Sequence, residues 1–201
     1  MATADPQAPM DVSTLEVVPL DRRHDRAAFS CDEESLTDYL RTRARQDVER
    51  DLASCWVLCA SGNPTIIGYY TLSATAVDVS SLPSEMAKKS GRYRVVGAAL
   101  LGRLAVDSRY ARQGLGSHLL LNALRRVLRT TRSGIGVKAV IVDALHERAA
   151  GFYEKFGFQR IEQDQRDQGD KQGADEPARL VLSLKTIREI FPGEGAEPDE
   201  P

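Results

Sequence analysis

The sequence predicts an α/β fold, because apolar stretches typical of strands alternate with helical patterns along the 201 residues. Two segments indicate this most clearly. An apolar stretch at about 96–106 runs into a turn rich in Arg and Gly, and a helical pattern at 116–128 follows at once. A second stretch, 138–145, is apolar throughout, as expected of a strand covered on both faces, and a short helix is expected at 148–156.

The other expected elements follow from periodicity and turn residues. Residues 15–20 are typical of a first strand, and 32–49 carry apolar residues at helical spacing, with Asp32 as a reasonable N-cap. Gly62-Asn63-Pro64 separates two β-rich stretches, 54–60 and 65–77, and predicts a hairpin. A short helical piece at 83–89 and a closing strand at 179–184 complete the pattern.

The length suits one domain, which we expect to span 13–190. Residues 1–12 lack any period and are expected to be disordered, as is the acidic tail at 191–201. The polar stretch 163–177 is expected to be a mobile loop. Since no secretory segment and no apolar run of about 20 residues is present, we expect a cytoplasmic protein that does not enter a membrane.

Charge and cysteine content exclude several classes of protein. The net charge is −2, but acidic residues gather after residue 160, so the rest of the chain is mildly basic. Three cysteines do not make a disulfide framework, and Cys55 and Cys59 are expected to be reduced thiols on one strand. The three histidines are scattered without the spacing of a zinc site, so no metal is expected.

The turn after residue 106 has the features of a pyrophosphate-binding site. A helix that begins directly after a glycine-rich turn presents unpaired backbone N–H groups and the positive end of its dipole. Gly114 and Gly116 would let phosphate oxygens approach the backbone closely. Glycines also end strands and cap helices for structural reasons alone, so this turn does not decide the function by itself.

Four further motifs indicate a protein family. They are the Phe-x-Cys segment at 29–40, Ile-Gly-Tyr-Tyr-Thr-Leu at 67–72, Leu-Gly-Arg-Leu-Ala-Val-Asp at 101–107 and the aromatic segment at 152–158. With them the chain resembles the GNAT acetyltransferases, and among these the toxins of toxin–antitoxin pairs, over about 15–160 and part of the last strand. The resemblance implies a central mixed, mostly antiparallel sheet of six to seven strands flanked by helices. It also implies acetyl-CoA as cofactor, aminoacyl-tRNA as the acetylated substrate with translation blocked as a result, a ribbon-helix-helix antitoxin as partner, and a homodimer.

The resemblance also implies which residues bind the cofactor. Backbone groups of Leu104, Ala105 and Val106 would contact the pantetheine arm and the thioester oxygen. Ala111 departs from the family pattern, which has Gln or Arg there, and this leaves open which side chain meets the pyrophosphate. The expected residues of the loop are Arg109, Ala111, Arg112, Gln113, Gly114, Leu115, Gly116 and Ser117.

Tyr153 is the expected catalytic residue. It matches the tyrosine that the family places beside the thioester sulfur, and a phenol with a pKa near about 10 is a suitable proton donor to a leaving thiolate. The ordinary alternative is that Phe152 and Tyr153 are aromatic core residues. His146 is the one nearby candidate for a general base, although the amine of an aminoacyl ester is neutral enough near pH 7 to need none.

Contacts to tRNA phosphates require basic side chains. The favoured group lies before the strand at 96–106, and a second lies on the first helix; for each single arginine a solvated helix face is the ordinary alternative. These expected residues are Lys88, Lys89, Arg92, Arg94, Arg41 and Arg45. Other basic series are Arg22, Arg23 and Arg26, and Arg125, Arg126, Arg129 and Arg132.

Two other functions stay open at this point. The first keeps the acetyltransferase but changes its substrate to a small amine or to an amine of a protein. The second is a degenerate GNAT fold used as a binding module, for which Ala111 is the one motivating feature.

Overall fold

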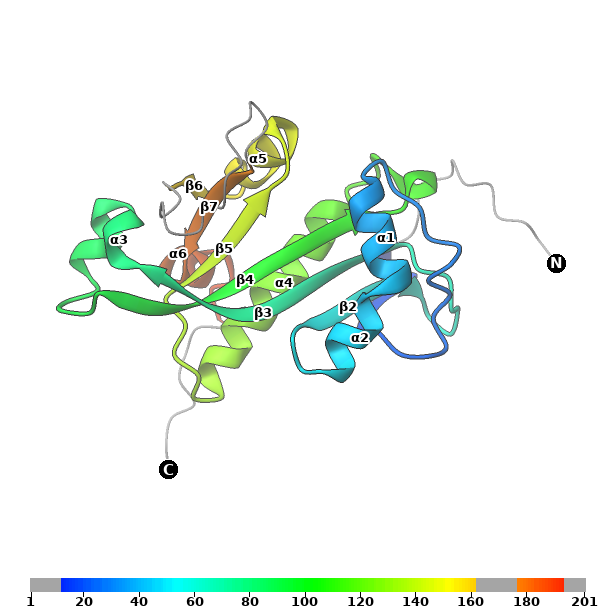
Figure 1. The fold of residues 1–201 in the computed structure, drawn as a ribbon, viewed down its shortest axis with the longest axis horizontal. Helices are drawn as coiled ribbons and strands as arrows, with labels where there is room; N and C mark the ends of the chain where they lie inside the picture. The colour runs from blue at the N-terminus through cyan, green and yellow to red at the C-terminus, as the bar shows by residue number, and fades with distance from the viewer. Residues whose placement is uncertain (1–11, 162–176, 194–201) are drawn as a thin grey trace. The chain divides into compact units, whose positions relative to one another are not determined.

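The computed structural model describes residues 12–161 and 177–193 (Figure 1). Within them lies a seven-stranded sheet with the strand order β1-β2-β3-β4-β5-β7-β6. The pairs β1–β2, β2–β3, β5–β7 and β6–β7 are antiparallel, whereas β4 and β5 pair parallel, so the expected mixed sheet is confirmed. The strands are β1 Leu15–Pro19, β2 Ser54–Ala60, β3 Gly68–Asp78, β4 Val95–Val106, β5 Ala139–Ala144, β6 Gln159–Arg160 and β7 Ala178–Ser183.

Six α-helices lie among the described residues. The helices are α1 Glu34–Thr42, α2 Ala44–Glu49, α3 Ser84–Lys88, α4 Leu115–Arg132, α5 Glu147–Glu154 and α6 Leu184–Ile190. Short 3-10 turns cover Val12–Thr14, Val79–Ser81 and Ser108–Tyr110.

Contacts divide the chain into two compact units. The first holds Met1–Ser73 and Gly102–Ala123, and the second holds Ala74–Leu101 and Leu124–Pro201. Strands β3 and β4 therefore contribute residues to both units. The expected single domain of 13–190 stays a prediction.

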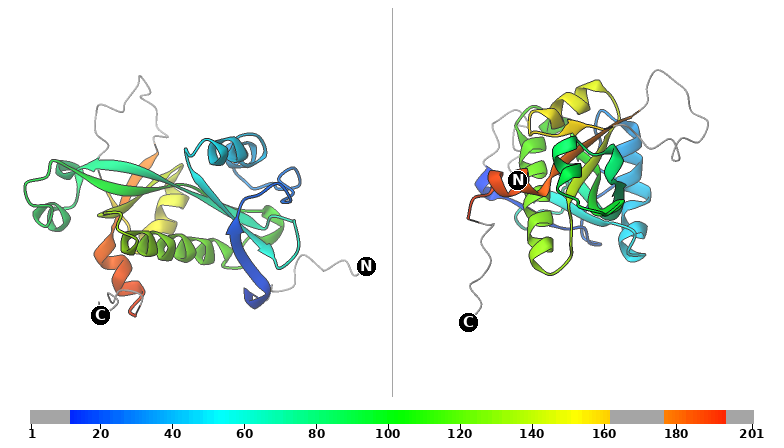
Figure 2. Two further views of the ribbon diagram at one scale, coloured as in Figure 1. Left: turned by 90° about the horizontal axis from the view of Figure 1, so that it is seen from below. Right: turned by 90° about the vertical axis from the view of Figure 1, so that its left-hand side faces the viewer.

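The first unit is built around the buried side chains of β2, β3 and α1. Phe29 and Tyr69 are fully buried and pack edge to face at 5.5 Å between ring centroids. The Tyr69 hydroxyl donates to the carbonyl of Leu36 at 2.7 Å, so this tyrosine joins β3 to α1. In this unit, α1 and α2 lie on one face of the strands and the start of α4 lies on the other (Figure 2).

The second unit has its own core. Val77, Ala98, Ile141 and Val181 pack together from β3, β4, β5 and β7. β5 and β7 pair along the whole of both strands, from Ala139 opposite Ser183 to Ala144 opposite Ala178. Helix α6 follows β7 directly and buries Leu184 and Ile187.

The expected helix at 32–49 is wrong as a single helix. It is interrupted at Arg43, whose φ of −115° lies outside the helical range, and the Tyr39 hydroxyl ties α1 to α2 through Asp47 at 2.9 Å. Asp32 is not the N-cap either, since Glu33 occupies that position. The Asp32 carboxylate instead accepts a hydrogen bond from the Ser108 hydroxyl at 3.0 Å.

Helix α6 and the short strand β6 were not expected from the sequence. Ser183 caps α6 by accepting from the backbone N–H of Thr186 at 3.0 Å. The folded part also extends past the expected end at residue 190, because Phe191 is buried and the Arg125 guanidinium lies 4.8 Å from its ring centroid. The expected disordered N-terminus, the loop at 163–177 and the rest of the tail lie almost entirely outside the described residues.

Within the described part of the chain, no helix combines the length and apolar character needed to cross a bilayer. In the same residues, no three His, Cys, Asp or Glu side chains gather as a metal would require. Cys55 and Cys59 are buried free thiols on β2, and Cys31 is a partly buried one.

Candidate active site

The strand–turn–helix expected at 96–128 is present. β4 ends at Val106, a 3-10 turn covers Ser108–Tyr110, and α4 begins at Leu115. Asp107 caps the 3-10 turn, since its carboxylate accepts from the backbone N–H of Arg109 at 3.0 Å. A tight change of direction is thereby fixed between the end of the strand and the start of the helix.

The backbone of the turn contains two residues in left-handed conformations. Arg112 and Gly114 both adopt left-handed conformations, with φ of 63° and 76°. Such alternation turns successive N–H groups toward one side of the chain and forms a concave nest. The N–H groups of Leu115, Gly116 and Ser117 belong to the first turn of an 18-residue helix, where no earlier turn offers carbonyls to them. This backbone is compatible with the expected phosphate cradle, which stays a prediction.

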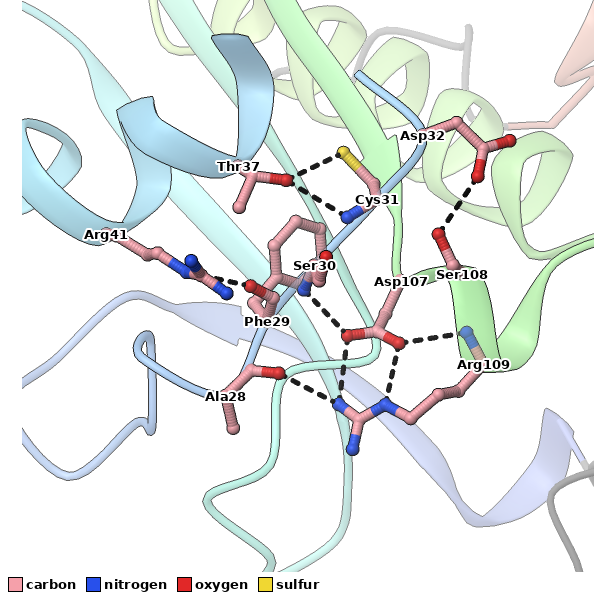
Figure 3. Close-up of polar contacts among 10 residues, drawn as sticks. All are labelled: Ala28, Phe29, Ser30, Cys31, Asp32, Thr37, Arg41, Asp107, Ser108 and Arg109. Atoms are coloured by element: carbon pink, nitrogen blue, oxygen red, sulfur yellow. Dashed lines mark hydrogen bonds and ion pairs between the residues drawn. The ribbon is translucent and has the colours of Figure 1, made fainter. Parts of the chain in front are cut away.

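Arg109 has a structural partner in this loop. Its Nε and Nη2 donate to the two carboxylate oxygens of Asp107 at 2.8 and 2.9 Å, and Nη2 also donates to the carbonyl of Ala28 at 3.2 Å (Figure 3). The guanidinium that the sequence offered to the pyrophosphate is thus directed at Asp107. Ala111, Arg112 and Gly114 are exposed in the loop.

Asp107 holds this loop in place, and the sequence analysis did not single it out. Its side chain is 1% exposed and also accepts from the backbone N–H of Ser30 at 3.0 Å. Burial by itself would raise the pKa of this carboxyl, but the hydrogen bonds from Arg109 and from the two backbone N–H groups outweigh it, so the pKa is lowered. An Asp after an apolar strand with an Arg two residues later was the available signal.

The segment 28–32 is braced against this loop by further bonds (Figure 3). Ser108 donates its N–H to the carbonyl of Ser30 at 2.8 Å and its hydroxyl to Asp32. The Cys31 N–H donates to the hydroxyl of Thr37 at 3.0 Å. The Cys-containing motif thus supports the loop that begins at Asp107.

Strand β4 approaches β3 closely just before the loop. A Cβ at Gly68 would lie 2.9 Å from the carbonyl oxygen of Ala105 and 2.8 Å from Cδ1 of Leu119, which explains the glycine there. Ala105 is buried, and Leu104 and Val106 are half-buried. Among the described residues, β4 pairs with β5 from Ala98 to Leu101. Residues Leu104–Val106 of β4 lie beyond the end of this pairing.

Tyr153 lies on α5 in the second unit. It is 8% exposed, and its ring packs against Phe152 and Phe158 at centroid distances of 5.1 and 5.5 Å. Burial raises the pKa of Tyr153, which keeps the hydroxyl protonated at neutral pH. His146 caps α5, since its Nδ1 accepts from the N–H of Ala149 at 3.0 Å. This capping gives His146 a structural role.

The basic residues expected to contact tRNA fall in both units. In the first unit, the Arg41 Nε donates to the carbonyl of Phe29, and Arg45 forms an ion pair with Glu49, each at 3.0 Å. In the second unit, exposed Lys88 pairs with Glu85 and exposed Arg94 with Asp78, each at 3.5 Å. Exposed ion pairs of this kind are weak and exchange readily with other partners. Lys89 and Arg92 are exposed as well.

Residues 51–160 match the family described as Acetyltransferase (GNAT) domain, which is more than half of the chain. The chain belongs to the GNAT acetyltransferase family. The matched segment of this GNAT acetyltransferase extends over β2 to β6 and includes both the loop at 107–117 and Tyr153. Ser30, which holds Asp107, lies before it.

Individual relatives agree with the family. The tRNA-acetylating toxin of Mycobacterium tuberculosis is 38% identical over 167 residues, which covers 83% of this GNAT acetyltransferase and 90% of the relative. A structure of AtaT complexed with acetyl-methionyl-tRNAfMet is similar with a TM-score of 0.74 at 27% identity, covering 88% and 99% of the two chains. An AtaT Tyr-to-Phe mutant bound to the C-terminus of the antitoxin AtaR and acetyl-CoA has a TM-score of 0.69 at 25% identity, covering 89% and 99%.

Proposed function

We propose that this GNAT acetyltransferase transfers the acetyl group of acetyl-CoA to the amino group of an aminoacyl-tRNA and thereby blocks translation. The observation that carries the proposal is the similarity to a tRNA-acetylating toxin over nearly the whole length of both chains. The AtaT structure with acetyl-methionyl-tRNAfMet supports the same substrate class. An acylated amino group cannot attack a peptidyl ester, so a modified aminoacyl-tRNA is useless for elongation.

The loop after β4 is the proposed cofactor site. The left-handed residues Arg112 and Gly114 and the start of α4 give a cradle that fits a pyrophosphate. When bound there, acetyl-CoA supplies the acetyl group as a thioester. Backbone groups of Leu104, Ala105 and Val106 are proposed to hold its pantetheine arm. The loop residues proposed to surround the pyrophosphate are Arg109, Ala111, Arg112, Gln113, Gly114, Leu115, Gly116 and Ser117.

Tyr153 is the proposed proton donor. Its buried hydroxyl keeps a proton at neutral pH and would donate it to the sulfur that leaves when the amine nitrogen bonds to the acetyl carbon. The amine loses one proton to solvent in the same reaction, and Tyr153 is reprotonated from solvent.

No general base is needed from the chain. The α-amino group has a pKa of about 8, and esterification of the adjacent carboxyl lowers it further, so much of the substrate amine is neutral at physiological pH. His146 is engaged as the cap of α5 and is not assigned to this step.

The proposed partners are tRNA and an antitoxin. Lys88, Lys89, Arg92 and Arg94 are proposed to contact tRNA phosphates together with Arg41 and Arg45. The AtaT complex with the C-terminus of AtaR supports an antitoxin partner. Its ribbon-helix-helix type and a homodimer of this chain are the finer parts of the proposal.

The test is transfer of labelled acetyl from acetyl-CoA to charged tRNA, with deacylated tRNA as the comparison. We expect label on charged tRNA alone. The rate of acetyl transfer should fall by a factor of about 100 or more in Tyr153→Phe. The matched control is Tyr70→Phe, which removes the hydroxyl of another buried tyrosine, one that donates to Asn122 at 2.8 Å, and should keep the rate. Binding of acetyl-CoA without labelled tRNA would reject the substrate and move the search to small amines and peptides.

A further inference from the structure

A second concave site lies in the second unit, outside the loop and Tyr153. It is a pocket of about 370 Å³, lined by residues of α3, the segment before β5, the turn before β6, the end of β7 and α6. This volume is at the small end of the range for ligand-binding sites. Its apolar floor includes Met86, Val137 and Val181.

The rim of the pocket is strongly basic. Lys89, Lys138, Lys185 and Arg188 line it, against one carboxylate from Glu85. The sequence analysis had singled out only Lys89 of these, because the other three lie about 50 to 100 residues further along the chain. Folding therefore gathers basic side chains that no single motif contains.

Lys138 is held in place within this pocket. It is half-buried, and its Nζ donates to the backbone carbonyl of Lys89 at 3.0 Å. A carbonyl leaves the positive charge of the ammonium intact, and an ammonium has three N–H donors, of which this bond uses one. The hydrogen bond is exposed, so the two remaining N–H donors of this positioned ammonium are accessible to an anion in solution.

Further donors line the pocket on α6. Lys185 and Arg188 are exposed and lie three residues apart on α6, so they share a face of the helix. Lys185 forms an exposed ion pair with Glu189 at 3.3 Å, which a stronger anion can displace. The hydroxyls of Ser183 and Thr186, 2.9 Å apart, also line the pocket.

The basic surface continues beyond the pocket. After Lys89 the chain presents Arg92, Tyr93 and Arg94, and Tyr93 is 75% exposed. An exposed aromatic ring between arginines is the arrangement on which unpaired bases stack in single-stranded nucleic acids. A free phosphate ion would contact the pocket alone, whereas a polynucleotide could contact both the pocket and the residues 92–94.

We propose that this pocket binds phosphate groups of the sugar–phosphate backbone of the tRNA substrate through Lys89, Lys138, Lys185 and Arg188. The inference rests on the proposed function for the identity of the RNA, and adds a binding site for it. Contacts of this kind orient the RNA and add affinity without reading its sequence.

The experiment measures binding of labelled deacylated tRNA as a function of salt. In Lys185→Gln/Arg188→Gln we expect affinity to fall about tenfold and the slope of log K against log salt to become shallower by about 2. The matched control is Arg50→Gln/Lys155→Gln, which removes the same charge from exposed positions outside the proposed contacts and should retain wild-type affinity and slope.

Two further measurements separate this proposal from the proposed function. The KM for charged tRNA should rise in the α6 variant, while kcat and the KM for acetyl-CoA stay unchanged. If the wild-type protein transfers no labelled acetyl to charged tRNA, the proposed function fails. The salt dependence of RNA binding still tests whether the pocket binds RNA. Unchanged tRNA affinity and salt slope in the α6 variant would overturn the pocket proposal. If that variant keeps its RNA binding but is no longer stabilised by inorganic phosphate, the pocket binds free phosphate instead. If it keeps its RNA binding but no longer binds an acidic antitoxin peptide, the pocket binds the antitoxin instead.

Discussion

The guanidinium of Arg109 meets the buried carboxylate of Asp107 edge to edge, with Nε 2.8 Å from Oδ1 and Nη2 2.9 Å from Oδ2. The same carboxylate accepts from the backbone N–H groups of Arg109 and Ser30. Four donors therefore converge on one acid at the point where β4 ends and the loop at 107–117 begins. Asp107 sets the position of the loop, and Arg109 and Ser30 fasten it to the segment at 28–32 (Figure 3).

Asp107→Asn should destabilise the protein. An asparagine turns an NH₂ group toward donors, so one side of the cluster is left without an acceptor, and we expect a loss of about 2 kcal/mol in the free energy of unfolding. Urea denaturation measures this loss. Asp32→Asn is the matched control, because it changes an exposed carboxylate that accepts a hydrogen bond from the Ser108 hydroxyl. It should cost less than about 0.5 kcal/mol. Equal losses in both variants would contradict the role of Asp107.

The contribution of Asp107 should depend on pH in a defined direction. Its pKa in the folded protein lies below the ordinary value of 3.8. The unfolded chain therefore binds the proton more readily, and the stability that Asp107 provides is full above that value and is lost as pH falls through the folded pKa. The difference in unfolding free energy between wild type and Asp107→Asn should be constant from pH 7 to about 5 and then shrink toward pH 3. A difference that grows on acidification would reject this account.

Gly68→Ala should be poorly tolerated. The added Cβ would lie 2.9 Å from the carbonyl oxygen of Ala105, a backbone atom that cannot move without shifting β4. We expect a loss of about 1 to 3 kcal/mol by thermal or urea unfolding. Gly151→Ala is the contrasting control, since a Cβ there meets nothing within 4 Å and lies inside α5. It should stabilise the protein by up to about 1 kcal/mol. Tolerance of Gly68→Ala would mean that β3 and β4 are free to separate.

Tyr153 should impose no alkaline limit on the reaction. Burial raises its pKa above the ordinary value of 10.0, so the hydroxyl stays protonated throughout the range in which the substrate amine becomes neutral. The single-turnover rate should rise from pH 6 to about 8 and then remain level to about 9.5. Tyr70→Phe should follow the same curve, and Tyr153→Phe should keep its shape at a much lower rate. A fall above pH 8 that disappears in Tyr153→Phe would show that this phenol ionises earlier.

The elements with strong local signals could be predicted from the sequence. Gly114 and the change from a continuous apolar strand to helical spacing predict the turn before α4. Gly62-Asn63-Pro64 predicts the turn between β2 and β3. Helix α6 gave no such signal, because it is only seven residues long and precedes a Pro- and Glu-rich tail. The break at Arg43 was hidden too, since the apolar stripe continues across it.

The candidate site also has parts that could be predicted from the sequence and parts that could not. Backbone features of the loop follow from glycine and helix placement, which are local properties. The Asp107 cluster depends on Ser30, 77 residues away in the chain, and the basic pocket joins Lys89 to Arg188. Neither arrangement has a period or spacing in the sequence, because each is created only when distant segments pack together.

Gly114→Ala tests the backbone cradle directly. Gly114 has φ of 76° with open space around a would-be Cβ, so alanine meets no clash but must adopt a left-handed conformation at a cost of about 1 kcal/mol. Relaxation of that strain would turn the N–H groups at the start of α4 away from the pyrophosphate. Stabilisation by acetyl-CoA, about 2.7 kcal/mol at 100 times its Kd, should therefore fall by about 1.4 kcal/mol if affinity drops tenfold.

The matched control for this change is Gly62→Ala in the β2–β3 turn. Gly62 has φ of 73° and the same open surroundings, so alanine there pays the same conformational cost outside the loop. Both variants should lose about 1 kcal/mol without ligand. In thermal unfolding with acetyl-CoA, only Gly114→Ala should also lose part of the ligand-induced stabilisation. Full stabilisation in both variants would mean that side chains of the loop, and not its left-handed backbone, bind the pyrophosphate.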